Sequence, residues 1–154
     1  MLSFLDDDDT FSDEKLEAVR STFQRSEVVF HTNRRVFVDA GGRRNGEEAV
    51  HPALEIKGSD EGALSKLMRL NMGVNSSNMS IRRSALDAIG VEQFRRMKLA
   101  VDRLYFVASL LQGGIMVYDP RPLTAFRCTA TRASSSRARW TLMLKKGAIR
   151  RRSL

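Results

Sequence analysis

The chain has 154 residues, of which 42% are hydrophobic and 29% are charged, and this composition excludes a wholly disordered protein. The net charge of +8 favours anionic partners such as nucleic acid, phosphorylated small molecules or an anionic membrane surface. Because Cys128 is the single cysteine, an internal disulfide framework and a cysteine-based zinc site are excluded.

The pattern of apolar, capping and turn residues predicts a mixed α/β chain. Strands are expected over residues 2–5, 27–31, 35–38, 115–118 and 123–127. Helices are expected over residues 13–25, with Ser12 as the N-cap, and over 60–70, 83–89 and 102–111. Between them we expect a hairpin-like excursion over 40–48, a short extended segment over 76–81 and a rigid turn at Asp119-Pro120-Arg121-Pro122.

Targeting signals are not visible in the sequence. The first residues lack the basic and long apolar regions of a secretory signal. The longest apolar stretch, 104–118, is interrupted by Gln112-Gly113-Gly114 and is shorter than the roughly 20 residues of a spanning helix. With one cysteine, which fits a reducing compartment, we expect a cytoplasmic protein, soluble or peripheral at the inner face of the membrane.

Charge divides the chain into an acidic front and a basic end. Residues 1–17 hold seven acids and one base, whereas residues 119–154 hold one acid and ten bases. We expect residues 1–128 to form one domain and residues 129–154 a basic tail. The tail is open to three interpretations: a solvated terminus, an interfacial helix around Trp140 on anionic lipid, or a nucleic-acid contact, which the acidic front disfavours.

The acidic front centres on four adjacent aspartates, Asp6 to Asp9, at the end of the first expected strand. Adjacent carboxylates repel one another unless a positive charge lies among them. Mg²⁺ and Mn²⁺ prefer carboxylate oxygens, and ligands bind where strands of an open α/β sheet end. A solvated acidic loop is the other interpretation, and both stay open on these residues alone.

This segment resembles the metal-binding region of family 2 glycosyltransferases of the GT-A fold. Asp6-Asp7-Asp8 fills the family's Asp-x-Asp motif, and Asp13-Glu14-Lys15-Leu16-Glu17 fills the start of the following helix. The resemblance implies that Asp6 and Asp8 bind Mg²⁺ or Mn²⁺ and the donor diphosphate, with Asp8 the more direct ligand. Asp9 is expected to support them.

A second stretch, residues 75–90, is similar to the family's segment that contains Asn-Met-Ser, a basic pair and a helix ending in Ile-Gly. Asn78 and Ser80 on an extended strand suit hydroxyl-rich ligands, and Arg82 and Arg83 suit phosphate. The other interpretation is a strand, a basic turn and an amphipathic helix with an apolar core face.

The third element of the resemblance is Asp102. In the family, the Asp of an acidic pair before a helix acts as the catalytic base, whereas here Val101 replaces the first acid of the pair. A helix N-terminus favours the ionised carboxylate. The other interpretation is an i,i+4 ion pair with Lys98, worth a few tenths of a kcal/mol. The resemblance extends from Phe4 to Arg127.

The resemblance implies a partial GT-A fold, a Rossmann-like mixed sheet flanked by helices and truncated at the N-terminus. Family members begin with a half that binds the nucleotide, and this sequence starts inside the strand that carries Asp-x-Asp. Three explanations stay open: a fragment of a longer reading frame, a degenerate relative, or a site completed by another polypeptide. An open sheet edge is expected where further strands would pair.

The expected function is that of a glycosyltransferase, an enzyme of the kind used in polysaccharide biosynthesis. It transfers a sugar from a nucleotide-diphosphate sugar to a hydroxyl of a glycan or lipid-linked acceptor, with inversion. Asp102 is the expected base. The alternative is a non-catalytic basic module that binds anionic membrane or nucleic acid through the tail.

Overall fold

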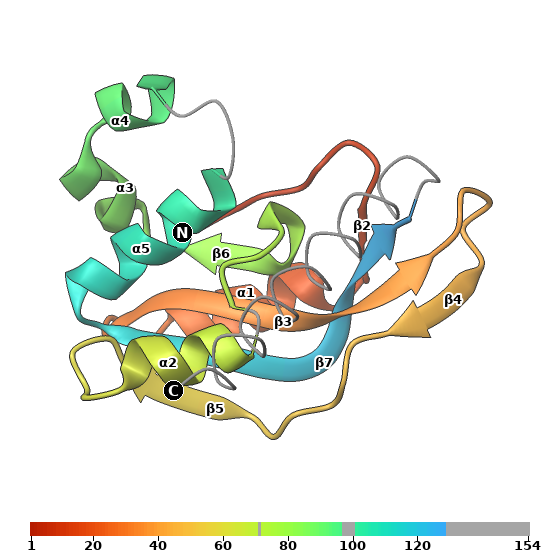
Figure 1. Cartoon of the computed structure of the whole chain (residues 1–154), viewed down its shortest axis with the longest axis horizontal. Coiled ribbons are helices and arrows are strands. Elements are labelled where there is room, and N and C mark those ends of the chain that lie inside the picture. The colour runs from red at the N-terminus through yellow and green to blue at the C-terminus, as the bar shows by residue number, and fades with distance from the viewer. Residues whose placement is uncertain (71, 97–100, 129–154) are drawn as a thin grey trace, which may run out of the picture.

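The computed structural model describes residues 1–70, 72–96 and 101–128, which form a mixed sheet with helices packed on both faces (Figure 1). Its strands are β1 (Leu2–Ser3), β2 (Thr10–Phe11), β3 (Val28–Val38), β4 (Arg44–Glu47), β5 (Leu54–Lys57), β6 (Met79–Ile81) and β7 (Ile115–Arg127). Its helices are α1 (Lys15–Phe23), α2 (Ala63–Arg69), the 3-10 turn η1 (Ser76–Asn78), α3 (Arg83–Ile89), α4 (Val91–Arg96) and α5 (Val101–Gln112).

The sheet is built around its two longest strands, β3 and β7, which pair in parallel. The main strand order is β1-β6-β3-β7-β2, with β4 paired to β3 and β5 paired to β7, and all these other pairings are antiparallel. The ribbon of β7 curls strongly along its length in Figure 1. The mixed α/β class with a mixed sheet flanked by helices is confirmed, and the GT-A family of the fold stays a prediction.

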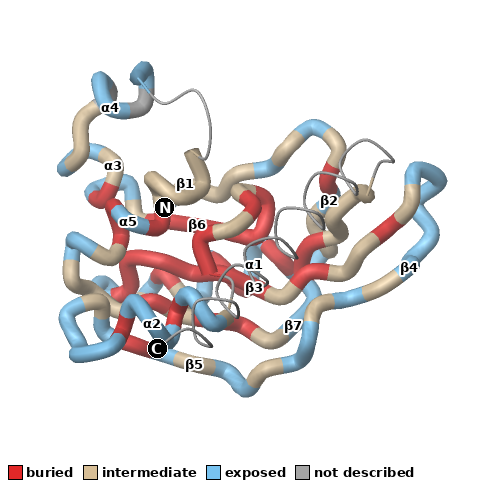
Figure 2. Tube along the Cα trace, viewed as in Figure 1, coloured by how far each residue is buried: buried red, intermediate tan, exposed pale blue. Residues whose placement is uncertain are grey.

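The two faces of the sheet are covered by different helices because successive side chains of a strand point in opposite directions. On one face, Ile115 and Val117 of β7 pack with residues of α1. On the other face, Met116 and Tyr118 join a core to which α2 and α5 contribute Leu67 and Phe106. Figure 2 shows buried residues along most of β3, which is therefore enclosed from both sides.

Most predicted elements are present, and their boundaries differ by a few residues. The helix predicted over 83–89 is α3, which ends at Gly90 with a φ of 81°. The expected hairpin over 40–48 is the β3–β4 connection. The strands predicted over 27–31 and 35–38 are one strand, because His31 to Arg35 continue the pairing with β7. Strands β2 and β5, the 3-10 turn η1 and helix α4 were not anticipated.

Two local predictions were wrong. The segment from Asp119 to Pro122 is not a turn between strands, because it lies within β7 and is accommodated by a shift in register opposite Asn33 and Arg34. Ser12 is not the N-cap of α1. That position is taken by Glu14, and the buried Ser12 hydroxyl has no hydrogen-bond partner in the structure.

Two further expectations concern membranes and the tail. Within the described part of the chain, no helix has the length and apolar character needed to cross a membrane. The basic tail expected over residues 129–154, including Trp140, lies outside the described residues.

Helix α2 offers a matched test of this packing, since Leu67 is fully buried and Leu64 is 52% exposed. We expect Leu67→Ala to lower the free energy of unfolding by about 2–5 kcal/mol, because a core cavity remains. Leu64→Ala should change it by no more than about 0.5 kcal/mol. Urea unfolding monitored by circular dichroism measures both, and similar costs for the two variants would contradict the orientation of α2.

Candidate functional site

The four aspartates form a turn after β1, here called the Asp loop (Asp6–Asp9). The backbone N–H of Asp9 donates to the carbonyl of Asp6 at 3.2 Å and closes the turn. The Asp6 carboxylate accepts from the Ser76 hydroxyl at 2.6 Å, and the Asp6 N–H donates to the Ser77 hydroxyl at 3.0 Å. The Asp loop is therefore fastened to η1, and of its members Asp7 is exposed and Asp9 is buried.

Asn75 joins the Asp loop to the start of α5. Its side-chain amide donates to Asp9 at 3.2 Å, and its backbone N–H donates to the Asp102 carboxylate at 2.9 Å. Its φ of 74° is unusual for a residue other than glycine, and the Asn side chain holds the conformation by accepting from the Ser77 N–H at 2.7 Å. The structure thus brings together the predicted base and a predicted diphosphate-site residue.

Glycine is required just before this junction. Gly73 has a φ of 82°, and a Cβ built on it would lie 2.6 Å from the ring of Phe106 in α5. Both the backbone conformation and the close approach exclude a larger residue. The segment that carries Asn75 is therefore held tightly against α5.

Asp102 lies in the first turn of α5 and accepts the Arg103 N–H at 2.9 Å in addition to that of Asn75. Two backbone N–H groups, those of Asn75 and Arg103, therefore fix the orientation of the Asp102 carboxylate. Burial, together with the charges of Asp6 and Asp102, raises the pKa of Tyr105, which stacks on Phe4 with ring centroids 4.1 Å apart. Asp6 and Asp102 therefore act on the same ring.

Negative charge at this junction is not balanced by ion pairs within residues 1–70, 72–96 and 101–128. Asp6, Asp9 and Asp102 bond there to amide, hydroxyl and backbone groups alone. The Arg127 side chain, although close, donates to the backbone carbonyls of Asp8, Asp39 and Ala40. Unbalanced carboxylates attract a cation.

A metal ion must be weighed against the donors that the Asp loop offers. No group of three or more His, Cys, Asp or Glu side chains suited to hold a metal occurs in the described residues. Mg²⁺ is commonly held by one or two carboxylates together with substrate phosphates. Hard carboxylate oxygens of half-buried Asp6 and Asp8 fit that second arrangement, so their role as ligands stays a prediction.

The polar residues predicted to contact acceptor or phosphate mostly have internal partners. The buried hydroxyl of Ser80 lies 2.8 Å from that of Ser3, and the buried Asn78 amide donates to the Asn33 carbonyl at 3.1 Å. Arg82 donates to the carbonyls of Val28, Phe23 and Arg25 at 2.7–3.2 Å, satisfying the end of α1. Ser80 and Arg82 are therefore engaged within the fold, and the contacts with acceptor or phosphate predicted for Asn78, Ser80 and Arg82 stay a prediction.

Arg83, the other member of the basic pair, is exposed at the start of α3. Its side chain lies 3.7 Å from Asp87, one turn further along the helix. Such a surface pair contributes little to stability. Its predicted contact with phosphate stays a prediction.

Beneath the Asp loop lies a buried polar cluster that sequence reasoning missed, here called the Lys15 cluster (Lys15, Asn33, Ser77 and Thr124). The fully buried Lys15 ammonium donates to the Asn33 side chain, to the Ser77 carbonyl at 3.0 Å and to the Thr124 hydroxyl at 3.1 Å. Burial lowers the pKa of Lys15 to about 7, and the charge of Asp119 opposes this shift. The cluster joins α1, β3, η1 and β7.

Two further buried titratable residues, His31 and Asp119, lie close together on the adjacent strands β3 and β7. His31, which the sequence suggested to be an ordinary surface or loop residue, is fully buried, and its Nε2 lies 3.6 Å from Asp119. Burial lowers the pKa of His31. Burial opposes ionisation of Asp119, but His31 and the 2.6 Å ion pair with Arg121 outweigh it and hold the Asp119 pKa well below its usual range.

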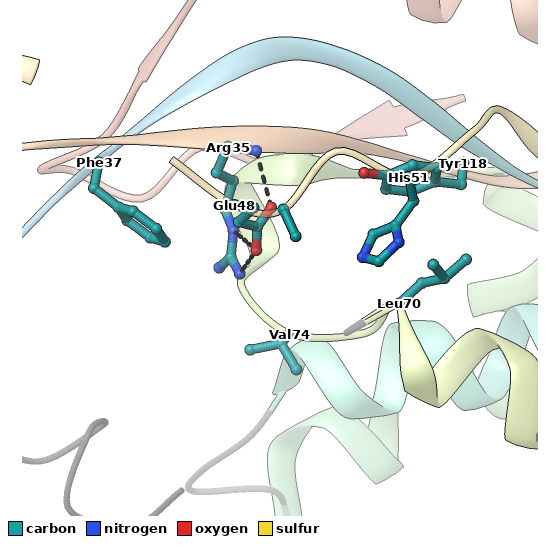
Figure 3. Close-up of a pocket in the computed structure, with 8 residues that line it drawn as sticks. Arg35, Phe37, Glu48, His51, Leu70, Val74 and Tyr118 are labelled. Atoms are coloured by element: carbon teal, nitrogen blue, oxygen red, sulfur yellow. Dashed lines mark hydrogen bonds and ion pairs between the residues drawn. The ribbon is translucent and has the colours of Figure 1, made fainter. Parts of the chain in front are cut away.

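A cavity of roughly 320 Å³ lies between the sheet and the segment that follows α2 (Figure 3). Leu70 and Val74 line it from this segment. Arg35, Phe37 and Glu48 line one side, and His51 and Tyr118 line another. Val74, which directly precedes Asn75 in the chain, faces them in Figure 3. One lining residue of the cavity is therefore adjacent in the chain to Asn75, which contacts Asp9 and Asp102.

Comparisons with protein-family models, with curated proteins and with solved structures give no match to this chain. The resemblance to family 2 glycosyltransferases therefore rests on the sequence motifs alone, and it stays a prediction.

The Lys15 cluster predicts a specific pH dependence. Between about pH 7 and pH 10 the unfolded chain keeps the Lys15 proton that the folded chain has lost, so raising the pH favours the folded chain. The wild type should therefore gain stability relative to Lys15→Met over this range, as measured by urea unfolding at several pH values. The control Lys66→Met removes an exposed lysine of α2. If the difference in the free energy of unfolding between the wild type and Lys15→Met did not change with pH, the lowered pKa of Lys15 would be contradicted.

Asn75 predicts an unusual order of substitutions. Asn75→Ala removes the side-chain bonds to Asp9 and Ser77 but keeps a Cβ at positive φ, now without the bonds that hold this conformation, so we expect a loss of about 2–4 kcal/mol in the free energy of unfolding. Asn75→Gly removes the same bonds but tolerates the backbone, and it should cost about 1 kcal/mol less. Equal losses in denaturant unfolding would show that the φ of residue 75 is not a constraint.

Proposed function

We propose that this chain carries the metal–diphosphate end and the catalytic base of a glycosyltransferase site. In this proposal a sugar passes from a nucleotide-diphosphate sugar to an acceptor hydroxyl with inversion at the anomeric carbon. The observation that carries the proposal is the Asn75 junction, which ties Asp9 of the Asp loop and Asp102 of α5 to one residue. Two acidic segments far apart in sequence thereby serve one site.

In this mechanism the Asp loop binds the departing group. Asp6 and Asp8 would hold Mg²⁺ or Mn²⁺, and the cation supplies positive charge that offsets the charge of the leaving diphosphate. Asp9, buried and bonded to Asn75 and to the Arg127 N–H at 3.0 Å, keeps the loop in place. Asp6 and Asp9 are therefore preorganised rather than free to swing.

Asp102 acts at the other end of the reaction. The acceptor oxygen attacks the anomeric carbon, the bond from that carbon to the diphosphate oxygen breaks, and the hydroxyl proton passes to Asp102. Its hydrogen bonds from Asn75 and Arg103 leave lone pairs on the carboxylate to accept this proton.

The acidic-loop interpretation explains less of this arrangement. A merely solvated run of carboxylates would place its members in water, where their repulsion is weakest. Here Asp9 is 5% exposed and Asp6 is bonded to η1 on both its side chain and its backbone. Asp9 also accepts hydrogen bonds from the Asn75 amide and the Arg127 N–H, an arrangement that a solvated loop does not require.

A metal titration of the full chain tests the proposal. Mn²⁺ is added alone and then with ADP, GDP or UDP, and the melting temperature is followed by differential scanning fluorimetry. At a hundredfold excess over Kd, binding adds about 2.7 kcal/mol, which corresponds to a rise of roughly 5–10 °C. Asp8→Asn should abolish the rise, whereas the matched control Asp7→Asn, at the middle position of the motif and exposed, should retain it.

The base is tested separately, with release of nucleoside diphosphate from a panel of nucleotide-diphosphate sugars as the readout. Asp102→Asn should keep the Mn²⁺-dependent rise in melting temperature and lose transfer. The proposal fails if neither Mn²⁺ nor Mn²⁺ with a nucleoside diphosphate stabilises the folded chain. If removal of residues 129–154 is then the only change that alters binding to anionic vesicles or nucleic acid, the alternative binding-module function gains.

A further inference from the structure

The cavity beside β3 and β7 is distinct from the Asp loop, and its chemistry points to a ligand class (Figure 3). We propose that this cavity, lined by Arg35, Glu48, Phe37, His51 and Tyr118, binds an uncharged sugar ring. Its role as the acceptor sugar rests on the proposed function, whereas its capacity to bind a sugar does not.

Size limits the ligand to a small molecule. The cavity of roughly 320 Å³ lies at the lower end of the range of about 300–1,000 Å³ for small-molecule sites. One ring or two fit this volume better than a long lipid chain. The cavity is also open to solvent, so that a ring at the end of a larger molecule can enter with its remainder outside.

The walls favour a ligand that has apolar faces. Tyr118 is buried at the floor, and its ring centroid lies 6.3 Å from that of the half-buried His51. Phe37 lies at the opposite end, in edge contact with Phe126 at 6.0 Å. Aromatic rings pack against the C–H faces of a sugar ring and remove that apolar surface from water.

The charged residues of the cavity, Arg35 and Glu48, form an ion pair that carries no net charge. Arg35 donates from Nε to Glu48 at 2.9 Å and from Nη2 to the same carboxylate oxygen, while the Arg35 N–H donates to the other oxygen at 2.9 Å. The Arg35 side chain is 9% exposed and that of Glu48 is 19% exposed, so the pair is largely desolvated. An anionic ligand would meet Glu48, and a cationic ligand would meet Arg35.

Adjacent hydroxyls match this pair. Nη1 of Arg35 takes part in none of the three bonds to Glu48 and is available as a donor, and the Glu48 oxygens keep lone pairs as acceptors. A hydroxyl both donates and accepts, so neighbouring hydroxyls of a sugar ring can bond to both members of the pair. Bonds in a partly dry site are stronger than in water.

The location of the cavity links the ligand to the proposed base. Val74 lines the cavity, and the next residue, Asn75, donates its backbone N–H to Asp102. A sugar held on the aromatic wall therefore lies beside the segment that positions the carboxylate proposed to take a hydroxyl proton.

The test measures sugar binding to the full chain by isothermal titration calorimetry and ligand-observed NMR without metal. The probes are methyl glucoside, methyl galactoside, methyl mannoside and N-acetylglucosamine, with glucuronate and glucosamine as charged counterparts. We expect at least one neutral sugar to bind more tightly than its charged counterparts. Glucuronate or glucosamine binding more tightly than every neutral probe would overturn the proposal.

Variants locate the binding. Glu48→Gln leaves Arg35 without its counter-charge, so neutral sugars should bind about tenfold more weakly and glucuronate should gain about tenfold relative to them. The matched control Glu47→Gln removes a neighbouring acid that pairs with Arg34 and Arg44 and does not line the cavity, and it should change neither affinity. His51→Ala, at a half-buried wall residue, should weaken neutral sugars about tenfold while the chain stays folded.

The outcomes separate this inference from the proposed function. Sugar binding that is lost in His51→Ala and retained in Asp8→Asn supports the cavity even if Mn²⁺ has no effect. A folded wild type that binds none of the sugars, or binding unchanged in both Glu48→Gln and His51→Ala, overturns the cavity proposal even if the Mn²⁺ result stands.

Discussion

The buried amino group of Lys15 connects most of the structure that positions the candidate site. Lys15 reaches from α1 to Asn33 of β3, to the Ser77 carbonyl of η1 and to Thr124 of β7. A buried lysine is costly unless each donor finds an acceptor, and here three acceptors from three other elements meet at its Nζ. The hydrogen bonds that satisfy the buried Lys15 Nζ therefore fix how the helix, the turn and the strands lie relative to one another.

The constraint is transmitted to the acidic residues through Ser77. Its carbonyl accepts from Lys15, its hydroxyl accepts from the Asp6 N–H, and its own N–H is capped by Asn75. Asn75 in turn reaches Asp9 and Asp102. A continuous chain of hydrogen bonds thus runs from Lys15 through Ser77 and Asn75 to Asp9 and Asp102, and it holds the candidate site in one arrangement.

Local sequence patterns predicted most of the helices and strands but not where some of them begin, continue or end. Helix α3 and the β3–β4 hairpin follow from apolar spacing and from glycines that adopt or permit turn conformations, so they could be found without tertiary information. Pro120 and Pro122 suggested a turn. They lie instead within β7, at a shift in register, because β7 pairs with β3 both before and after them. Ser12 fits a cap by type, but α1 begins at Lys15, the residue that enters the core, with Glu14 at the N-cap position.

By itself the sequence determined the mixed α/β class, the run of four aspartates and the resemblance that singled out Asp6, Asp8 and Asp102. It did so because residue type and short-range spacing are local properties of the chain. The tertiary structure alone decided that Lys15 and His31 are buried, that Asn75 joins Asp9 to Asp102, and that Arg35 and Glu48 share a cavity. These are contacts between distant segments, and their free energy depends on the whole packed sheet rather than on any stretch of sequence.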